Sequence, residues 1–220
     1  MTWTDQGLRA ALAAIGVAVV ALAMSLTAGA QSTAKNLIVN GNAEQGASSP
    51  NGYDVVPEIP GWTRRGGFTV VEYGAADFPG TQTGTAVHGG AKFFAGGPGN
   101  AGSAVSQTVS VASQKQLIDS GKARATLSGY LGGYGGQDDS LIATAVFLGQ
   151  SGARMGTVLK LGPVGAAARK LQTGMIPKTV TGPIPKGTRS VRVTLSANRT
   201  SGSYNDGYAD NLSLTIGRWP

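Results

Sequence analysis

The sequence predicts an all-β protein, a β-sandwich built from short strands. Glycine makes up 35 of the 220 residues and recurs between short runs that are rich in β-branched residues. The clearest runs alternate apolar and polar side chains, as where Arg192 and Thr194 separate Val191, Val193 and Leu195. This period of two is typical of a strand with one buried face. Short strands with turn residues between them favour a sandwich or barrel over βαβ units.

The individual elements follow from these runs. The segment from Ser113 to Gly121 is the one helical pattern, with Ser113 as a start and Gly121 as an end, so we expect a short helix near residues 113–120. We expect about nine or ten strands, at residues 36–40, 68–73, 91–95, 103–111, 123–131, 141–148, 155–160, 175–181, 188–196 and 209–216.

Residues 1–30 have the layout of a signal peptide. Arg9 precedes an apolar run from Ala10 to Met24, and small residues follow at Ala28-Gly29-Ala30. We therefore expect export and one β-sandwich domain over residues 31–220, secreted or held at the cell surface, with no membrane span after cleavage. The alternative is that residues 10–27 stay as an anchor, since the run is only slightly shorter than the ~17–25 residues of a span.

Composition excludes several classes of function. The chain has no cysteine, one histidine (His88) and a net charge of +7. Thiol chemistry is therefore excluded, and zinc or copper sites are not expected. The segment Gly97-Pro-Gly-Asn-Ala-Gly102 matches a nucleotide-binding pattern by letter, but a strand pattern follows it where that motif needs a helix. The basic residues are scattered without interleaved aromatic residues, so we expect no nucleic-acid partner.

Acidic and amide side chains near both ends of the domain are candidate calcium ligands. Ca²⁺ takes six to eight oxygens, from carboxylates, amides and backbone carbonyls. Glu44 and Asp210 offer carboxylates, and Asn36, Asn42 and Asn211 offer further oxygens. The alternative is that these acids cap turns or pair with arginine. Asp138 and Asp139 are adjacent and would point to opposite sides of an extended backbone, so they do not form the carboxylate pair of a glycosidase.

Aromatic residues are scarce, so their positions are informative. Trp62, Phe68 and Phe147 fit core positions, whereas Phe93 and Phe94 are consecutive and one of them should face away from the core. Two tyrosine-bearing segments combine rings with polar side chains, which suits sugars because their C–H faces stack on rings and their hydroxyls bind polar groups. The alternative is that these segments pack on themselves. The candidate ligand-binding residues are Tyr130, Tyr134, Gln137, Asp138, Tyr204, Asn205 and Asp206.

Taken together, several segments resemble the galactose-binding-like jelly-roll superfamily, which includes many carbohydrate-binding modules. The stretch from Leu127 to Asp139 also resembles the sugar-binding F-box-associated domain. The segments that carry the resemblance are Asn36-Leu-Ile-Val-Asn-Gly-Asn-Ala-Glu44, Ile59-Pro-Gly-Trp62, Ser106-Gln-Thr-Val109, Pro185-Lys-Gly-Thr-Arg-Ser-Val-Arg-Val193 and Asp206-Gly-Tyr-Ala-Asp-Asn-Leu-Ser-Leu214.

The resemblance implies an antiparallel two-sheet jelly roll, frequently with a structural calcium near the chain termini. Carried over to this sequence, the metal ligands are Glu44 and Asp210, with Asn36 as a further ligand. Our first functional hypothesis is an exported, non-catalytic protein that binds glycans at the cell surface or outside the cell. The alternatives are a structural or adhesive protein that binds a protein partner, and a glycoside-active enzyme. Exposed tyrosines in a groove favour the first, a flat apolar patch the second, and two carboxylates across a cleft the third.

Overall fold

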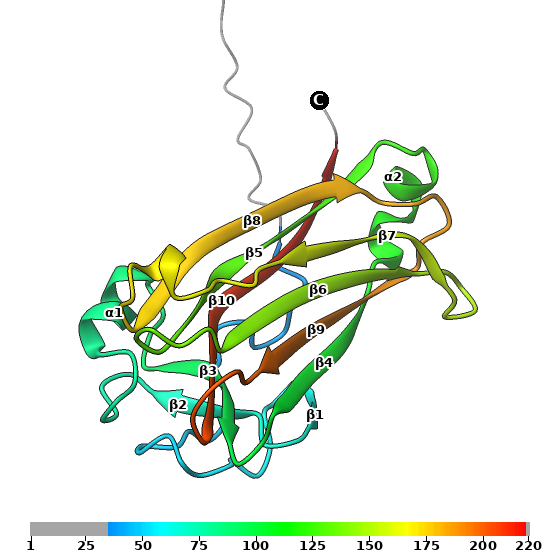
Figure 1. Cartoon of the computed structure of the whole chain (residues 1–220). Coiled ribbons are helices and arrows are strands. Elements are labelled where there is room, and N and C mark those ends of the chain that lie inside the picture. Colours follow the sequence, from blue (N-terminus) through cyan, green and yellow to red (C-terminus); the bar gives the residue numbers. More distant parts are fainter. Residues whose placement is uncertain (1–34, 219–220) are drawn as a thin grey trace, which may run out of the picture. The chain divides into compact units, whose positions relative to one another are not determined.

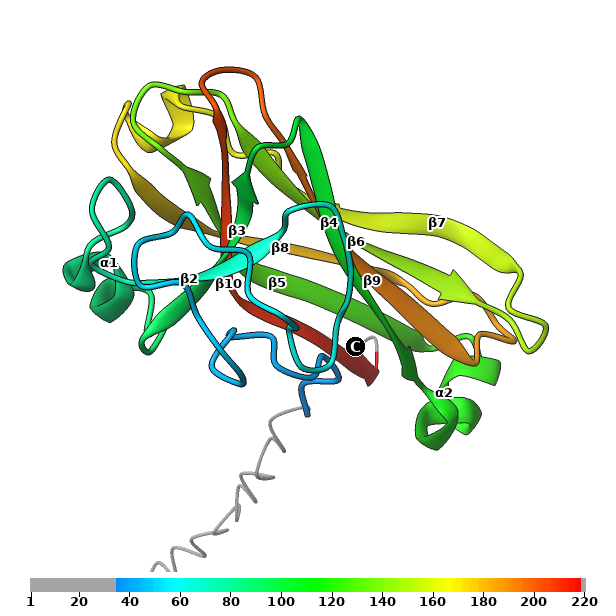
Figure 2. The same cartoon turned by 90° about the horizontal axis from the view of Figure 1, so that it is seen from below.

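The structure is a computed structural model that describes residues 35–218. These residues form two antiparallel sheets of five strands each, packed face to face as a sandwich (Figures 1 and 2). The predicted signal peptide, residues 1–30, lies outside the described residues. Within residues 35–218 no helix has the length and apolar character needed to cross a membrane.

We name the sheets by one central strand each. The β4 sheet consists, in spatial order, of β1 (Thr63–Arg65), β4 (Gly102–Ser110), β9 (Ser190–Asn198), β6 (Ser140–Leu148) and β7 (Arg154–Leu161). The β10 sheet consists of β2 (Thr69–Glu72), β3 (Lys92–Pro98), β10 (Tyr204–Arg218), β5 (Ala123–Gly133) and β8 (Gly174–Pro183).

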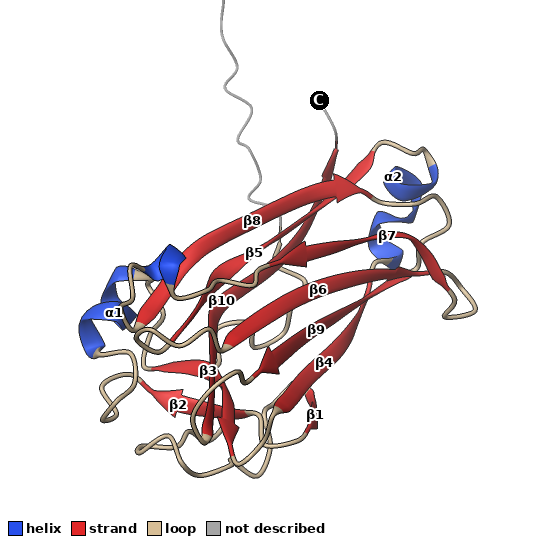
Figure 3. Ribbon diagram, in the orientation of Figure 1, coloured by secondary structure: helices blue, strands red, loops and turns tan. Residues whose placement is uncertain are grey.

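Helical structure is confined to connections between strands. Helix α1 (Thr81–Ala86) lies at one end of the sandwich, and α2 (Lys115–Asp119) lies at the other (Figure 3). Two single turns of 3₁₀ helix, η1 (Ala112–Gln114) and η2 (Ala167–Arg169), complete the described elements. Together η1 and α2 confirm the short helix expected near residues 113–120.

The main core fills the space between the sheets. Strand alternation directs one face of each sheet inward, as in β5, where Ala125, Leu127 and Leu131 are fully buried. They pack with residues of the opposite sheet such as Phe147 and Leu195. Burial of this apolar surface drives the packing of one sheet on the other.

The segment 36–40, expected as a strand, is not one. The left-handed φ angles of Asn40 (49°) and Ala43 (58°) interrupt an extended backbone here. The segment instead lies beside the second half of β10, held by backbone and side-chain hydrogen bonds. Asn36 Oδ1 accepts the N–H groups of Ile38 (3.0 Å) and Leu214 (2.9 Å), and Asn36 Nδ2 donates to the carbonyl of Leu212 (3.0 Å).

Two further differences between the predicted and the observed elements lie near the candidate functional site. Helix α1 was not expected, because its residues, Thr81–Ala86, have weak helix propensity and include Gly84. Strand β10 begins at Tyr204 rather than near 209, so the segment Tyr204–Asp206 is part of a strand and not of a loop. Its register places Tyr204 opposite Pro98 and Asn205 opposite Gly97 of β3.

A second apolar cluster lies on the outer face of the β10 sheet. Phe94 points into the main core as expected, whereas Phe93 points outward and is nevertheless fully buried. The segment that contains α1 covers it, with Phe78 contributing a buried ring 6.4 Å from that of Phe93. We call this group the outer cluster; it comprises Val71, Tyr73, Phe78, Val87, Phe93, Ala95, Met175, Tyr204 and Tyr208.

We expect Asn36→Ala to destabilise the sandwich by about 1–3 kcal/mol, because it leaves the N–H of Leu214 and the carbonyl of Leu212 without their side-chain partner. Urea unfolding in the presence of EDTA measures the loss. Asn42→Ala is the matched control, since Asn42 is exposed in the same segment. Equal effects of the two substitutions would contradict the role assigned to Asn36.

Candidate functional site

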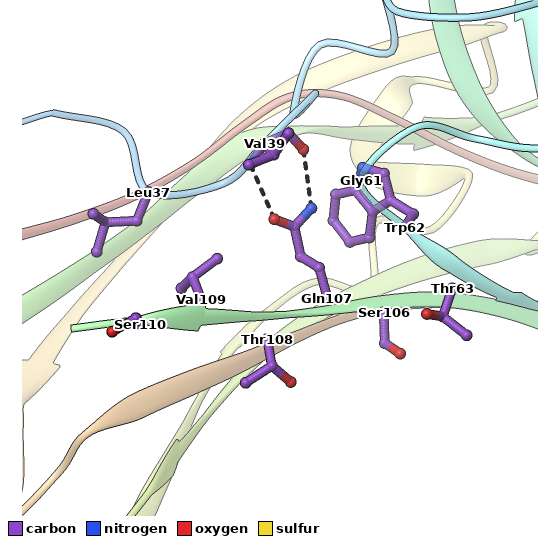
Figure 4. A pocket seen from close by; sticks show the side chains of 10 residues that line it. All are labelled: Leu37, Val39, Gly61, Trp62, Thr63, Ser106, Gln107, Thr108, Val109 and Ser110. Carbon is purple, nitrogen blue, oxygen red and sulfur yellow. Dashed lines mark hydrogen bonds between the residues drawn. The ribbon is translucent and has the colours of Figure 1, made fainter. Parts of the chain in front are cut away.

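One hollow is a slot between the segment 37–39 and strand β4 (Figure 4), with a volume of about 590 Å³. Both amide atoms of Gln107 bind the backbone of Val39: Oε1 accepts its N–H and Nε2 donates to its carbonyl, each at 2.9 Å. Trp62 is buried as expected, and its Nε1 donates to the carbonyl of Asn40 (3.1 Å). None of the ten residues that line the slot is ionisable, and the amide of Gln107 and the Nε1 of Trp62 are already paired.

A second hollow, which we call the aromatic pocket, lies beside the outer cluster and has a volume of about 220 Å³. It combines rings, carboxylates and an amide, and its residues come from four separate segments of the chain. Ligand pockets typically show this combination of apolar walls and a few convergent polar groups. The lining residues are Tyr53, Asp77, Phe78, Tyr134, Gln137, Gly202, Ser203, Tyr204 and Asp206.

Three rings of the pocket stand nearly perpendicular to one another. The ring centroids of Tyr53 and Phe78 are 6.0 Å apart, those of Tyr53 and Tyr204 5.7 Å, and those of Phe78 and Tyr204 5.1 Å, with interplanar angles of 77°, 78° and 79°. Tyr53 keeps 56% of its surface exposed, whereas Phe78 and Tyr204 are buried. The pocket thus has a rigid aromatic wall and one solvent-accessible ring at its rim.

Asp206 is the buried carboxylate of the pocket. Its Oδ1 accepts a hydrogen bond from the hydroxyl of Tyr208, two residues further along the same face of β10. Burial raises the pKa of Asp206 to about 6; the Tyr208 hydroxyl and Arg169 oppose the rise, and the charge of Asp139 adds to it. Around neutral pH this side chain is therefore largely ionised, and it becomes a neutral acid as the pH falls below about 6.

Two buried polar atoms of pocket residues have no hydrogen-bond partner among the described residues. They are the hydroxyl oxygen of Tyr204, whose side chain is only 7% exposed, and Oε1 of Gln137. A buried polar group without a partner is costly, and such groups are usually satisfied by water or by a ligand. Their presence in one pocket supports a binding role for it.

The loop after β5, which carries Tyr134 and Gln137, is held by Arg169. This arginine is only 5% exposed, and its guanidinium donates to the carbonyls of Gly133 (2.9 Å), Gly135 (3.0 Å) and Gln137 (2.7 Å). Burial lowers the pKa of Arg169, but a guanidinium remains charged because its ordinary pKa is so high. The loop is thus fixed by charge-assisted bonds rather than by regular structure.

The loop before β10 is held by Asp139 in the same way. Asp139 is fully buried, and its Oδ1 accepts from Thr200 N (2.6 Å), Thr200 Oγ1 (2.9 Å) and Ser201 N (3.0 Å). Its Oδ2 accepts the backbone N–H of Asp206 (3.0 Å). The neighbouring Asp138 is exposed and points elsewhere, to the N–H of Ala166 (2.8 Å), as the opposite orientations expected from the sequence require.

Of the predicted ligand-binding residues, the structure brings four together in the aromatic pocket: Tyr134, Gln137, Tyr204 and Asp206. Tyr130 packs against the outer cluster, Asp138 binds Ala166, and Asn205 is buried on the opposite face of β10, so these three do not line it. Sequence reasoning missed Tyr53, Asp77 and Phe78. Tyr53 lies in Asn51-Gly-Tyr-Asp54, a polar turn with a ring like those chosen around Tyr134 and Tyr204, so the same rule would have found it.

The predicted metal ligands Glu44 and Asp210 lie at another part of β10. Asp210 is fully buried; its Oδ2 accepts from the Tyr73 hydroxyl (2.6 Å) and its Oδ1 from Asn211 N (2.6 Å). Burial raises the pKa of Asp210 to about 7, those two hydrogen bonds oppose the rise, and the charge of Glu44 adds to it. Glu44 Oε1 accepts the N–H groups of Ala91 (2.9 Å) and Lys92 (2.8 Å).

This arrangement fits a cation in part. Gly89 and Gly90 leave room for the two carboxylates, since a Cβ at Gly89 would lie 2.1 Å from Asp210 Oδ2 and one at Gly90 would lie 2.7 Å from Glu44 Oε1. Asn36 differs, because its side chain is fully used in holding the terminal segment. No group of three or more His, Cys, Asp or Glu side chains suited to a metal occurs among residues 35–218. A calcium ion here would need backbone carbonyls and water besides the two carboxylates, and it stays a prediction.

Comparison with known proteins identifies the fold. No protein-family model matches the sequence, and no curated protein matches it. A solved structure of a cyclase from Fischerella sp. TAU in complex with 4-(1H-indol-3-yl)butan-2-one matches with a TM-score of 0.52 and 14% identity, over 84% of this chain and 98% of that one. The match shows a shared fold, the antiparallel two-sheet β-sandwich.

Other solved structures match at lower TM-scores. The carbohydrate-binding module TmCBM61, in complex with β-1,4-galactotriose, matches with a TM-score of 0.46 and 14% identity, over 84% of this chain and all of that one. The enzymatically active domain of bacteriophage CBA120 tailspike protein 4 matches with a TM-score of 0.43 and 17% identity, over 78% of this chain. The match spans only 21% of the tailspike chain.

We expect Asp139→Ala to lower the free energy of unfolding by roughly 2–4 kcal/mol, because it leaves the buried N–H of Asp206 and the loop donors unpaired. Asp138→Ala, in the adjacent exposed position, should cost about 1 kcal/mol or less. Urea unfolding of both variants measures the difference. Similar losses for the two would show that Asp139 does not anchor the loop before β10.

For the calcium prediction, we expect the melting temperature to fall with excess EDTA and to recover with added calcium. An ion present at about 100 times its Kd stabilises the folded state by ~2.7 kcal/mol. Glu44→Gln and Asp210→Asn should each abolish the response, whereas Asp54→Asn, an exposed control, should keep it. If the melting temperature of protein shown to be metal-free changes with neither EDTA nor calcium, the calcium prediction is wrong.

Proposed function

We propose that this protein is an exported, non-catalytic binding protein that recognises glycans through the aromatic pocket. The observation that carries the proposal is the convergence of four rings, a buried carboxylate and two unpaired polar atoms in one hollow. Export rests on the predicted signal peptide at residues 1–30, and the place of action would be the cell surface or the surrounding medium.

The pocket suits a sugar because it offers both kinds of contact that a sugar ring uses. Tyr53 and Tyr134 present aromatic surface for the C–H faces of a pyranose. The hydroxyl of Tyr204, Oε1 of Gln137 and the carboxylate of Asp206 are available to its hydroxyl groups. The volume of about 220 Å³ is below the ~300–1,000 Å³ of drug-sized pockets, which favours a single sugar unit or the end of a chain.

The alternative functions predict different surfaces. A protein-binding role favours a flat apolar patch, but the large exposed apolar side chains among the described residues are Val39, Tyr53, Val55 and Leu171, and Tyr53 belongs to the pocket rim. A glycoside-active enzyme would use Asp77 and Asp206, the two carboxylates that line the pocket. In that case Asp206, with its raised pKa, would be the acid.

The test is a glycan array followed by calorimetric titration of the best oligosaccharide. Tyr53→Ala and Tyr134→Ala should weaken binding about tenfold or more, because each removes a ring from the contact surface. Val39→Ala is the matched control: Val39 is exposed too, but it lines the slot. The bound mixtures are also analysed for released sugars, and we expect none.

Two outcomes would contradict the proposal. If no glycan binds, or if the tyrosine substitutions leave the affinity unchanged while Val39→Ala reduces it, the aromatic pocket is not a glycan site. If sugars are released by the protein and not by Asp206→Asn, the protein is a glycoside-active enzyme instead.

A further inference from the structure

The charges that line the aromatic pocket have the opposite sign to the charge of the protein. The chain carries a net charge of +7, with 18 lysines and arginines. The carboxylates of Asp77 and Asp206 nevertheless line the pocket, and none of the described lysines or arginines does. Two guanidinium groups bind backbone carbonyls of lining residues, Arg169 that of Gln137 (2.7 Å) and Arg199 that of Ser203 (2.9 Å). They support the loops and do not enter the hollow.

The rings of the pocket add a second attraction for positive charge. Tyr53, Phe78 and Tyr204 stand nearly perpendicular in pairs, with centroids 5.1–6.0 Å apart. The face of an aromatic ring attracts a cation through its quadrupole, and several rings around one point reinforce one another. The free groups of the pocket are also acceptors: Oε1 of Gln137 and the oxygen of Tyr204 lack a partner, and Oδ2 of Asp206 has none among the described residues. The carboxylate of Asp206 only accepts hydrogen bonds, so it favours a ligand that supplies donors.

We propose that the glycan unit taken by the aromatic pocket carries a protonated amino group, as an unacetylated amino sugar does. This inference rests on the proposed function and specifies its ligand class. The ammonium group lies between the rings and the carboxylate of Asp206, and the sugar ring lies against Tyr53 and Tyr134. An ammonium group supplies three donors, which can bond to the carboxylate of Asp206 and to the unpaired oxygens of Tyr204 and Gln137.

The closing experiment compares three β-1,4-linked trimers that share a glucose-type backbone and differ at one carbon: glucosamine, N-acetylglucosamine and glucose. Calorimetric titration at low ionic strength and about pH 7 should give binding of the glucosamine trimer about ten- to a hundredfold tighter than of the other two. Asp206→Asn should remove most of this preference. Glu58→Gln, an exposed control with the same change of charge, should keep it.

The preference should also depend on pH. Asp206 faces the Tyr208 hydroxyl, Tyr204, Asp139 and Arg169, and its burial among them raises its pKa to about 6. Because the folded protein protonates Asp206 below that value, binding of the glucosamine trimer should weaken at about pH 5, while binding of the acetylated trimer should change little. Asp206→Asn should abolish this pH dependence.

The outcomes separate this inference from the function on which it rests. If neutral glycans bind as tightly as the glucosamine trimer, the amino-sugar inference is wrong and glycan binding stands. If tetramethylammonium binds but no glycan does, the pocket takes a cation that is not a sugar, and both proposals are wrong. If none of these probes binds, and no glycan of the array does, both are again overturned.

Discussion

The β10 sheet is apolar on both faces where β2, β3 and the first part of β10 pair, and the rest of the structure depends on this constraint. Phe94 and Ala209 face the main core, while Phe93 and Tyr208 face outward and are equally buried. A sheet of this kind needs a second layer on its outer face, because exposed rings would lose the free energy that burial provides. The segment around α1 supplies that layer. The aromatic pocket lies where this cover meets the loops at the end of the sheet, so fold and site follow from the same requirement.

The loops around the pocket are held by buried charges rather than by apolar packing. Arg169 binds three carbonyls at the end of β5 and in the loop after it. Asp139 binds four donors in the segment before β10 and at its start. Hydrogen bonds offset the cost of burying a charge, and several bonds from one charged group fix its partners in place. Such preorganisation reduces the entropy lost on binding. The Gly-rich loops are thereby held in one conformation, which fixes the positions of Tyr134, Gln137 and Asp206 in the pocket.

The sequence predicted the sandwich and most strands, because the alternation of apolar and polar residues follows directly from the burial of one strand face. The prediction was wrong where side-chain hydrogen bonds, or a segment that covers the outer face of a sheet, determine the structure. Segment 36–40 has the apolar pattern of a strand. However, the side-chain amide of Asn36 makes the hydrogen bonds to Leu212 and Leu214 of β10 that the backbone of a paired strand would make. Tyr204–Asp206 has the composition of a turn, yet it is the start of β10. The carboxylate of Asp139 accepts the backbone N–H of Asp206 there. Four predicted ligand residues meet in the pocket because they flank Gly-rich loops; Phe78 could not be found, since nothing local shows that α1 folds over the outer face. The roles of Arg169 and Asp139 depend on contacts between distant segments.

The central claim is that ligand binds in the aromatic pocket on the outer face and not in the larger slot beside β4. An NMR titration of backbone amides with the tightest-binding oligosaccharide tests it most directly. We expect the chemical-shift changes to concentrate at Tyr53, Phe78 and Gln137, and at Gly202 to Asp206, the segments that line the pocket. Changes concentrated at Val39, Trp62 and Gln107, which line the slot, would contradict it.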